Sequence, residues 1–264
     1  MKYILIVVIF VSSLWAGNYE KGLEAYKSKN YKEAAKWWTL AGNSCNPGAQ
    51  FNLGLKYEYG KGVQQDFKEA IKWYKRAAEQ GLLQAQFNLG NMYLNAKGVK
   101  QNDKEAFKWF ILAAKQGSPS AQYICGYMYD RGIGIKNNYK EAVKWYTLAA
   151  KQGYIESQYS LGEMYRLGLG VQRNYEKAIK WYTLASEQGQ PYAQYELANL
   201  YYLGSHVNKD YKKAHKWFKL SANQGNPDSQ IALQSLCKKG LLKLVDIRDK
   251  NDNELMINFR SRFR

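Results

Sequence analysis

The residues that could act in catalysis are few in this sequence. Ser235-Leu236-Cys237-Lys238 has the Ser-x-x-Lys spacing that places a hydroxyl nucleophile beside a lysine in serine β-lactamases. The S-D-N and K-T-G elements that complete such a site are absent from the sequence. We therefore predict no catalytic site, with Ser235 and Lys238 as the one weak candidate pair.

Metal-binding residues are equally sparse. The only histidines are His206 and His215, and the only cysteines are Cys45, Cys125 and Cys237. A zinc site needs three or four ligands close together, whereas both histidines fit structural or surface positions. The cysteines lie two and three repeats apart, and a disulfide needs Cα atoms within about 7 Å. We expect no metal, no cofactor and no intrachain disulfide.

The elements that would position any site come from an internal repeat. A tryptophan recurs at every 36th residue: Trp37, Trp73, Trp109, Trp145, Trp181 and Trp217. An Ala-Gln or Ser-Gln pair recurs with the same step, starting at Ala49, Ala85, Ala121, Ser157, Ala193 and Ser229. Such a period predicts a stack of similar units, each touching only its neighbours.

Each unit has the pattern of two helices. The first reads A-Q-x-x-L-G-x-x-Y and ends at a G-x-G-V loop, whose glycines favour left-handed backbone. The second reads Y-x-x-A-x-K-W-Y-x-x-A-A, with apolar residues at helical spacing. We expect the small residue within the first helix to allow close packing, and the tryptophan to fill the space between pairs. The residues expected at the N-cap of the second helix are Asp66, Asn102, Asn138, Asn174 and Asp210.

The pattern divides the chain into five parts. Residues 1–16 join one lysine, an apolar run and small residues, as a secretory signal peptide does. Residues 17–46 form an N-terminal capping helix pair, and residues 47–226 form five full repeats. Residues 227–240 form a C-terminal capping half-repeat, and 241–264 a basic tail. We expect no membrane-spanning segment after removal of the signal, and a monomer.

The formal net charge of +17 favours an anionic partner in principle. The basic residues are spread over every repeat, and one lysine precedes each repeated tryptophan. Pairs such as Glu69–Lys72 and Glu141–Lys144 stand three residues apart and partly neutralise this row. A solvated face is the expected interpretation, with binding of an anionic envelope polymer as an alternative. Rows of Trp and Tyr at the repeat period are core positions, so we expect no nucleic-acid partner.

The repeated unit resembles the sel-one-like repeat, a relative of the tetratricopeptide repeat. The match covers residues 47 to 240, and the first helix pair fits more loosely. The resemblance implies an all-α fold, an α/α right-handed superhelical solenoid with a concave face, and a scaffold or adaptor role. An exported protein of this kind is similar to the Helicobacter cysteine-rich proteins, some of which bind penicillin or act as weak β-lactamases. This chain lacks their cysteine pairs.

The leading hypothesis is therefore a periplasmic or secreted scaffold that binds a protein or peptide through its concave face. A β-lactam-binding protein or weak β-lactamase is the alternative by family analogy. On the first helices, the positions that the core does not use run in steps of four, three and four. They give the candidate binding residues Gln84, Asn88, Asn91, Asn95, Tyr127, Arg131, Glu163, Tyr192, Glu196 and Asn199. Amide and tyrosine side chains of this kind suit a peptide backbone or sugar hydroxyls.

Overall fold

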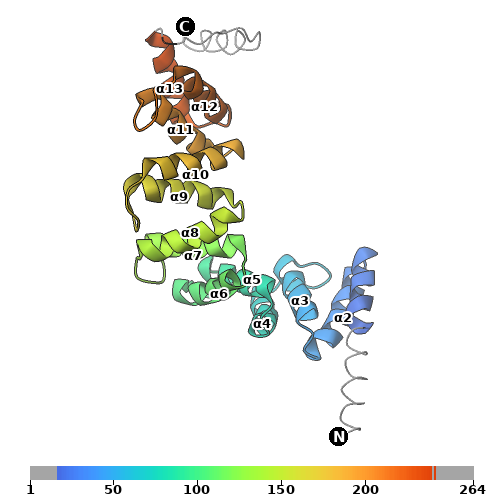
Figure 1. Ribbon diagram of the computed structural model, residues 1–264. Coiled ribbons are helices and arrows are strands. Elements are labelled where there is room, and N and C mark those ends of the chain that lie inside the picture. The colour runs from blue at the N-terminus through green and yellow to red at the C-terminus, as the bar shows by residue number, and fades with distance from the viewer. Residues whose placement is uncertain (1–16, 240, 242–264) are drawn as a thin grey trace. The chain divides into compact units, whose positions relative to one another are not determined.

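The computed structural model describes residues 17–239 and residue 241. Within that part the regular secondary structure is helical, and residues 17–27 belong to the first helix. Twelve further helices follow, as Figure 1 shows: α2 (Tyr31–Asn43), α3 (Pro47–Tyr59), α4 (Phe67–Glu79), α5 (Leu83–Leu94), α6 (Asp103–Lys115), α7 (Pro119–Arg131), α8 (Tyr139–Lys151), α9 (Ile155–Leu167), α10 (Tyr175–Glu187), α11 (Pro191–Leu203), α12 (Tyr211–Asn223) and α13 (Pro227–Lys238). The expected signal peptide and all of the expected tail except Leu241 lie outside the described residues.

The chain divides into two compact units, with the boundary between Ala149 and Ala150. In the first unit, each helix from α2 to α7 packs against the next one along the chain. In the second unit, the same holds from α9 to α13. The fold is thus the predicted all-α repeat solenoid. None of the described helices has the length and apolar character needed to cross a membrane.

The second helix of each pair begins at the predicted residue. Asp66 accepts hydrogen bonds from the backbone amides of Lys68 and Glu69 at 2.8 and 3.1 Å. The side chains of Asn102, Asn138, Asn174 and Asp210 cap α6, α8, α10 and α12 in the same way. A side-chain oxygen here satisfies amides that have no partner within the helix. The N-cap predictions are confirmed.

The most buried aromatic row is not the tryptophan row. The residue after each repeated tryptophan is at most 2 % exposed: Trp38, Tyr74, Phe110, Tyr146, Tyr182 and Phe218. Of the repeated tryptophans only Trp73 reaches the buried class, at 6 %. The tryptophans fill the space between pairs, as expected: Trp109, Trp145 and Trp217 pack against the core cluster formed by the two helices before their own. One residue along a helix rotates the side chain by about 100°, which turns the following ring into the centre of the pair.

The repeated glycine of the first helix makes room for that ring. A Cβ atom built on Gly54 would lie 2.4 Å from the ring of Tyr74, and one on Gly162 would lie 2.6 Å from Tyr182. Gly90 and Gly126 stand in the same relation to Phe110 and Tyr146. Close packing at this glycine was predicted, and the structure shows that an aromatic face, rather than a helix backbone, occupies the space.

A glutamine pair ties the two ends of each repeat together. The side-chain amide of Gln86 donates to the carbonyl of Ala78 at 3.1 Å. Its own oxygen accepts from Gln116 Nε2 at 2.7 Å, 30 residues away. Gln50, Gln158 and Gln194 make the same two bonds, one to a carbonyl of the preceding repeat and one to a glutamine of their own. The recurring Ala-Gln and Gln-Gly pairs are thus explained by polar groups that satisfy one another in the interior.

Some loop positions that other repeats give to glycine carry a side chain here. Cys45 and His206 have φ of 66° and 63°, in the left-handed region. The His206 ring lies 3.6 Å from that of Tyr175 and almost parallel to it. Cys45, Cys125 and Cys237 are free thiols. Burial raises the pKa of Cys125 to about 12, which leaves that thiol unreactive at neutral pH.

Candidate interaction surface

The first helices of the repeats, α5, α7, α9 and α11, carry nine of the ten predicted binding residues, and the tenth, Asn95, is the C-cap residue of α5. We call the side-chain rows at these positions, with their equivalents on α13, the first-helix face. Gln84, Asn95, Tyr127, Arg131 and Tyr192 are exposed on it. Asn88, Asn91, Glu163, Glu196 and Asn199 are half-buried. The first six of the ten residues, from Gln84 to Arg131, lie in the first unit and the remaining four in the second, so they form two surfaces.

On the first unit, a buried carboxylate holds a buried tyrosine. The Tyr74 hydroxyl donates to Glu58 Oε2 at 2.7 Å. Lys97 Nζ lies 3.4 Å from the other oxygen of the same carboxylate. Burial and this carboxylate raise the pKa of Tyr74 well above its usual range, and the Asn88 side chain hydrogen-bonds to it. Glu58 therefore has its charge compensated from within the chain.

The next tyrosine along the first unit repeats this arrangement with an aspartate. The Asp130 carboxylate hydrogen-bonds to Tyr146 and lies 3.7 Å from Arg131 Nε. Burial nevertheless raises the pKa of Asp130. The Arg131 guanidinium also stands 5.9 Å from the ring of Tyr127, which is 41 % exposed. Two predicted residues, Tyr127 and Arg131, are thus brought together, and both the ring and the carboxylate already have a cation beside them.

In the second unit, Glu163 is the carboxylate that hydrogen-bonds to the buried tyrosine. Arg166 Nε and Nη2 lie 3.0 and 2.6 Å from the two oxygens of Glu163, which is a bidentate pair. The Tyr182 hydroxyl donates to the same carboxylate. The hydrogen bond to Glu163 raises the pKa of Arg166, and burial raises that of Tyr182. Glu163 is therefore fixed in place by two partners.

Glu196, on the neighbouring helix α11, has a different environment. It is half-buried, and burial raises its pKa above the ordinary value. The Glu163 carboxylate adds to the rise, Arg166 opposes it, and Asp228 on α13 adds to it again. No side-chain hydrogen bond or ion pair reaches the Glu196 carboxylate from the described residues, in contrast to Glu58 and Glu163.

Two tyrosine rings border this carboxylate. The ring of Tyr159 lies 6.2 Å from that of Tyr192 and 6.1 Å from that of Tyr182. After burial, the charges of Glu163 and Glu196 are the main causes that raise the pKa of Tyr159. Tyr192 is 56 % exposed, one turn before Glu196 on the same helix. We call Tyr159, Glu163, Tyr192 and Glu196 the acid–tyrosine patch.

Sequence analysis named three of these four residues and missed Tyr159, together with Arg166 and Tyr182. A signal for the buried bonds is present in the sequence. The residue after the repeated tryptophan is tyrosine in some repeats and phenylalanine in others. Sixteen residues before Tyr74 and Tyr146 the sequence has an acidic residue. Sixteen residues before Phe110 and Phe218 it has Leu94 and Tyr202 instead. Of the predicted residues, Gln84 and Asn199 make no contact that joins them to either cluster, and Asn95 bonds only to the Asn91 carbonyl.

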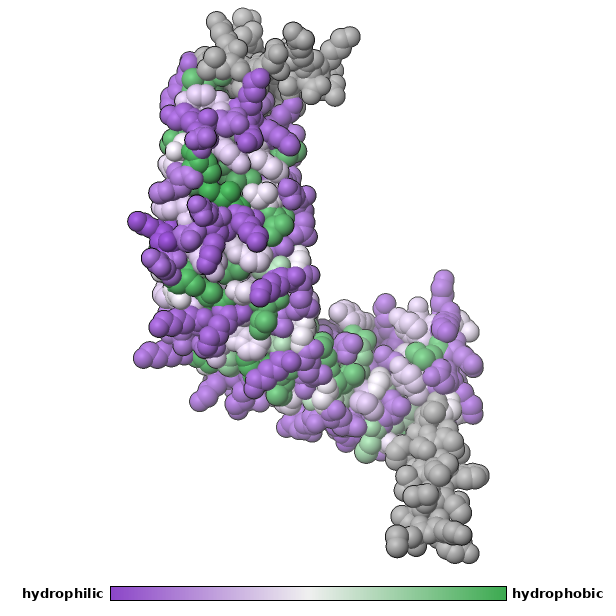
Figure 2. All heavy atoms as spheres, viewed as in Figure 1, coloured by the Kyte–Doolittle hydropathy of each residue, from purple (hydrophilic) through white to green (hydrophobic). Residues whose placement is uncertain are grey.

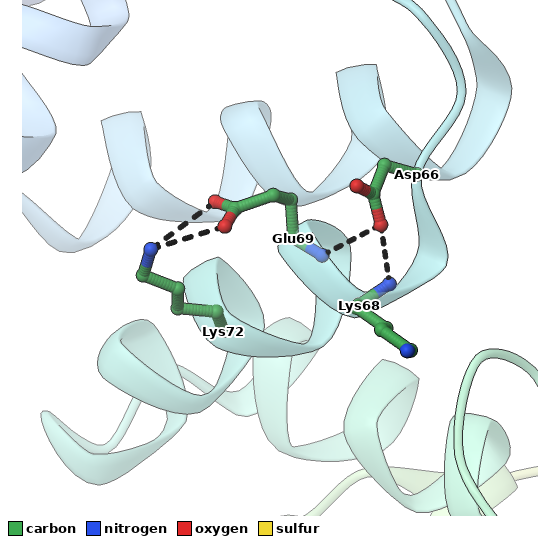
Figure 3. Close-up of polar contacts among 4 residues, drawn as sticks. All are labelled: Asp66, Lys68, Glu69 and Lys72. Carbon is green, nitrogen blue, oxygen red and sulfur yellow. Dashed lines mark hydrogen bonds and ion pairs between the residues drawn. The ribbon is translucent and has the colours of Figure 1, made fainter.

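The lysine row belongs to the second helices. Lys72 Nζ lies 3.0 Å from Glu69 Oε1 just after the N-cap residue Asp66, as Figure 3 shows. Lys36, Lys108 and Lys144 pair with a glutamate three residues earlier in the same manner. Hydrophilic side chains cover most of the surface seen in Figure 2, with smaller apolar areas between them. The predicted partial neutralisation by Glu69 and Glu141 is confirmed.

One lysine lies inside the protein instead of on its surface. Lys56 is 3 % exposed, and its ammonium lies 3.9 Å from the ring centre of Tyr26, 4.5 Å from Tyr31 and 5.5 Å from Trp38. Burial, followed by the charge of Lys61, lowers the pKa of Lys56 to about 8. Aromatic faces attract a cation, so these three rings offset part of the free-energy cost of burying the Lys56 ammonium.

The candidates for catalysis gain no companions. Ser235 and Lys238 lie near the end of α13, where the Ser235 carbonyl accepts the backbone amide of Lys239. Burial and Lys219 lower the pKa of His215, which sits on α12. The described residues hold no group of three or more His, Cys, Asp or Glu side chains placed for a metal ion.

Comparison with known proteins shows what the chain is similar to. The sequence model of the Sel1 repeat matches residues 14–44, 47–82, 83–118, 119–154, 155–190 and 191–226. No curated protein matches the chain. Among solved structures, a protective antigen present in uropathogenic Escherichia coli strains is 39% identical, with a TM-score of 0.80. The match covers 86% of this chain but only 50% of the antigen.

Two further structures bear on the same comparison. A Sel1 repeat protein from Oxalobacter formigenes is 37% identical with a TM-score of 0.73, and the match covers 85% of this chain and 90% of that one. Cysteine-rich protein B of Helicobacter pylori is 22% identical over 49% of this chain and 92% of its own, with a TM-score of 0.39.

Proposed function

Because the chain belongs to the Sel1 repeat family, we propose that it is an exported scaffold that binds a protein or peptide partner through the concave, first-helix face of its repeats. Sel1 repeats typically mediate protein–protein interactions. Nothing in the described part of the chain adds a catalytic group to Ser235, so enzymatic activity is not part of the proposal.

One observation carries the choice of face. The packing residues recur from repeat to repeat, while the first-helix positions change, and several of them expose large apolar groups. Tyr127 is 41 %, Leu167 50 %, Tyr192 56 % and Leu203 60 % exposed. Exposed aromatic and aliphatic side chains beside polar groups are typical of protein interfaces. The second helices also expose leucines such as Leu112 and Leu148, but these recur at the repeat period. The lysines of the same helices pair with glutamates, and exposed pairs of this kind contribute little to binding.

A site-directed crosslinking experiment tests the face. A photoreactive amino acid is placed at Tyr127 or Tyr192 on the first helices, and at Lys72 or Lys144 on the second helices as matched exposed controls. Irradiation in the producing cell should give a discrete adduct from the first pair and none from the second. Adducts from the lysine positions alone would contradict the choice of face.

Export is supported by the order of charge, apolar run and small residues over positions 1–16. Its test is separate from that of binding. The full chain is expressed with a C-terminal affinity tag, and the N-terminus of the purified protein is determined by mass spectrometry after fractionation. Cleavage near Ala16 with the protein outside the cytoplasm is the expected result. An intact N-terminus in the cytoplasmic fraction would overturn export and leave the binding face untouched.

A further inference from the structure

Among the described residues, the carboxylates of the first-helix rows lie on the second unit. Its first-helix rows carry the carboxylates Glu156, Glu163, Glu196 and Asp228. Lys239 is the basic residue in those rows, and it donates to the Tyr202 hydroxyl at 2.8 Å. The chain as a whole has a net charge of +17. An acidic area on so basic a protein selects a positively charged ligand over a negative one.

Glu163 is the carboxylate of this area that pairs with a cation, and Glu196 has no direct partner among the described residues. Arg166 is held by both oxygens of Glu163. Glu196 is half-buried, and the charges of Glu163 and Asp228 raise its pKa while the charge of Arg166 opposes the rise. A half-buried carboxylate without a close partner is costly. A cation supplied from outside would remove this cost on binding.

The tyrosine rings beside Glu196 also lack a cation from the described residues. No lysine or arginine of the described part lies over the ring of Tyr159 or Tyr192, although cations lie over Tyr127, Tyr165 and Tyr201. Tyr192 leaves 56 % of its surface to solvent. A tyrosine face next to a carboxylate gives an ammonium or guanidinium both a cation–π contact and a charge-assisted hydrogen bond.

The first unit contains an example of aromatic rings that contact a lysine. In the first unit, the ammonium of Lys56 lies between the rings of Tyr26 and Tyr31 at 3.9 and 4.5 Å. There the protein itself supplies the cation that contacts the aromatic rings. At the acid–tyrosine patch, the rings and the carboxylate are present and the cation is not supplied by the described residues.

We infer that the acid–tyrosine patch receives a lysine or arginine side chain of a basic peptide segment, held by Glu196 and the rings of Tyr159 and Tyr192. This rests on the proposed function and names the chemistry of the partner. Glu163 positions the patch through Arg166 and Tyr182, and Glu196 is the contact carboxylate. The apolar side chains of Leu167 and Leu203, 50 % and 60 % exposed, flank the same rows and suit the neighbouring residues of the peptide.

The test uses a fluorescein-labelled, end-blocked peptide of lysine, arginine, glycine and serine, and a matched peptide with glutamate at the basic positions. Fluorescence anisotropy with the full chain should show saturable binding of the basic peptide, weakened by added salt. The glutamate peptide should bind more weakly. The overall charge of the protein repels the basic peptide, so its binding reports a local site. Tighter binding of the glutamate peptide would overturn the inference.

Three variants locate the site. Glu196→Gln should weaken binding of the basic peptide by about tenfold or more, because it removes a charged hydrogen-bond partner. Tyr192→Leu keeps apolar bulk and should weaken binding by about threefold. Glu187→Gln, which removes an exposed carboxylate from α10 on the second-helix side, should leave it unchanged. Equal affinity of the Glu196→Gln variant and the native chain would contradict the inference.

Folding of the variant is checked by its thermal midpoint, which should be unchanged or higher for Glu196→Gln, because the uncompensated charge is removed. The two proposals fail in different ways. A photochemical adduct at Tyr127 without binding of the basic peptide would overturn the acid–tyrosine site and leave the interaction face standing. Absence of adducts at both Tyr127 and Tyr192 would overturn the proposed function as well.

Discussion

The Tyr74 hydroxyl donates a 2.7 Å hydrogen bond to Glu58 Oε2, and both residues are buried. The two lie sixteen residues apart, on α3 and α4 of one repeat. Lys97 of the next repeat reaches the other oxygen of Glu58. A core aromatic ring is thereby connected to the surface of the first helices through one carboxylate.

The Tyr74→Phe variant tests the contribution of this bond. Loss of a hydrogen bond to a buried charged group should lower the free energy of unfolding by about 2 kcal/mol. The measurement is chemical denaturation followed by circular dichroism. The reverse change, Phe110→Tyr, places a hydroxyl opposite Leu94 and should also destabilise, and adding Leu94→Glu should recover part of the loss. No recovery in the double variant would show that the acid is not the required partner.

The buried glutamines should matter more than their exposed neighbours. Gln86→Leu keeps most of the side-chain volume but removes two hydrogen bonds, one to the Ala78 carbonyl and one from the Gln116 amide, which retain only their bonds to the Gly81 amide and the Gly81 carbonyl. We expect a loss of about 2 kcal/mol or more in the free energy of unfolding. Gln84→Leu, two residues away and exposed, should change it by less than about 0.5 kcal/mol. Similar values for the two variants would mean that the glutamine pair is dispensable.

Lys56 should give the protein a measurable dependence on alkaline pH. Its pKa is about 8 in the folded chain and 10.5 ordinarily. Between these values the unfolded chain binds more protons, so the free energy of unfolding contributed by Lys56 rises with pH. Subtracting the pH profile of a Lys56→Met variant from that of the native chain isolates this rise. Direct titration of the Lys56 ε-carbon by NMR should give the same midpoint, and a midpoint near 10.5 would contradict it.

Cys45 occupies a left-handed backbone position at φ 66°. A residue with a Cβ atom is disfavoured there and glycine is not. Cys45→Gly should therefore raise the free energy of unfolding by about 1 kcal/mol. Cys237→Gly, which also removes an exposed thiol but lies in α13, should lower it by about 0.5 to 1 kcal/mol. The same sign of change at both positions would show that the thiol, and not the backbone, decides the effect.

The sequence was sufficient for the architecture because the architecture depends on period and on local chemistry. Asp66 and Asn102 cap helices through bonds to amides two and three residues away, and such bonds are visible in any window of the chain. The left-handed conformation of Cys45 and His206 could be expected because glycine stands at their positions in other repeats. The repeat itself thus supplied the comparison that a single sequence usually lacks.

The core packing and the contacts of the first-helix face were harder to predict from the sequence. The repeated tryptophan is conspicuous in the sequence, but the ring that follows it, such as Tyr74, is the more deeply buried one. The bond between Glu163 and Arg166 could be read from their spacing of three, but the contact of both with Tyr182 depends on how two helices cross. Tyr159 was not among the predicted residues, yet its ring lies 6.2 Å from that of Tyr192 in the next repeat.

The bonds that hold the fold and the groups proposed to hold a partner differ in one respect. Glu58 and Tyr74, like Gln86 and Gln116, lie inside a single repeat, so duplication or deletion of a whole repeat carries both members together. Tyr159 and Tyr192 come from consecutive repeats, and a change in repeat number would give either ring a new neighbour. Recombination in steps of one period can therefore replace the proposed ligand preference of this chain while bonds such as Glu58–Tyr74 and Gln86–Gln116 stay intact within each repeat.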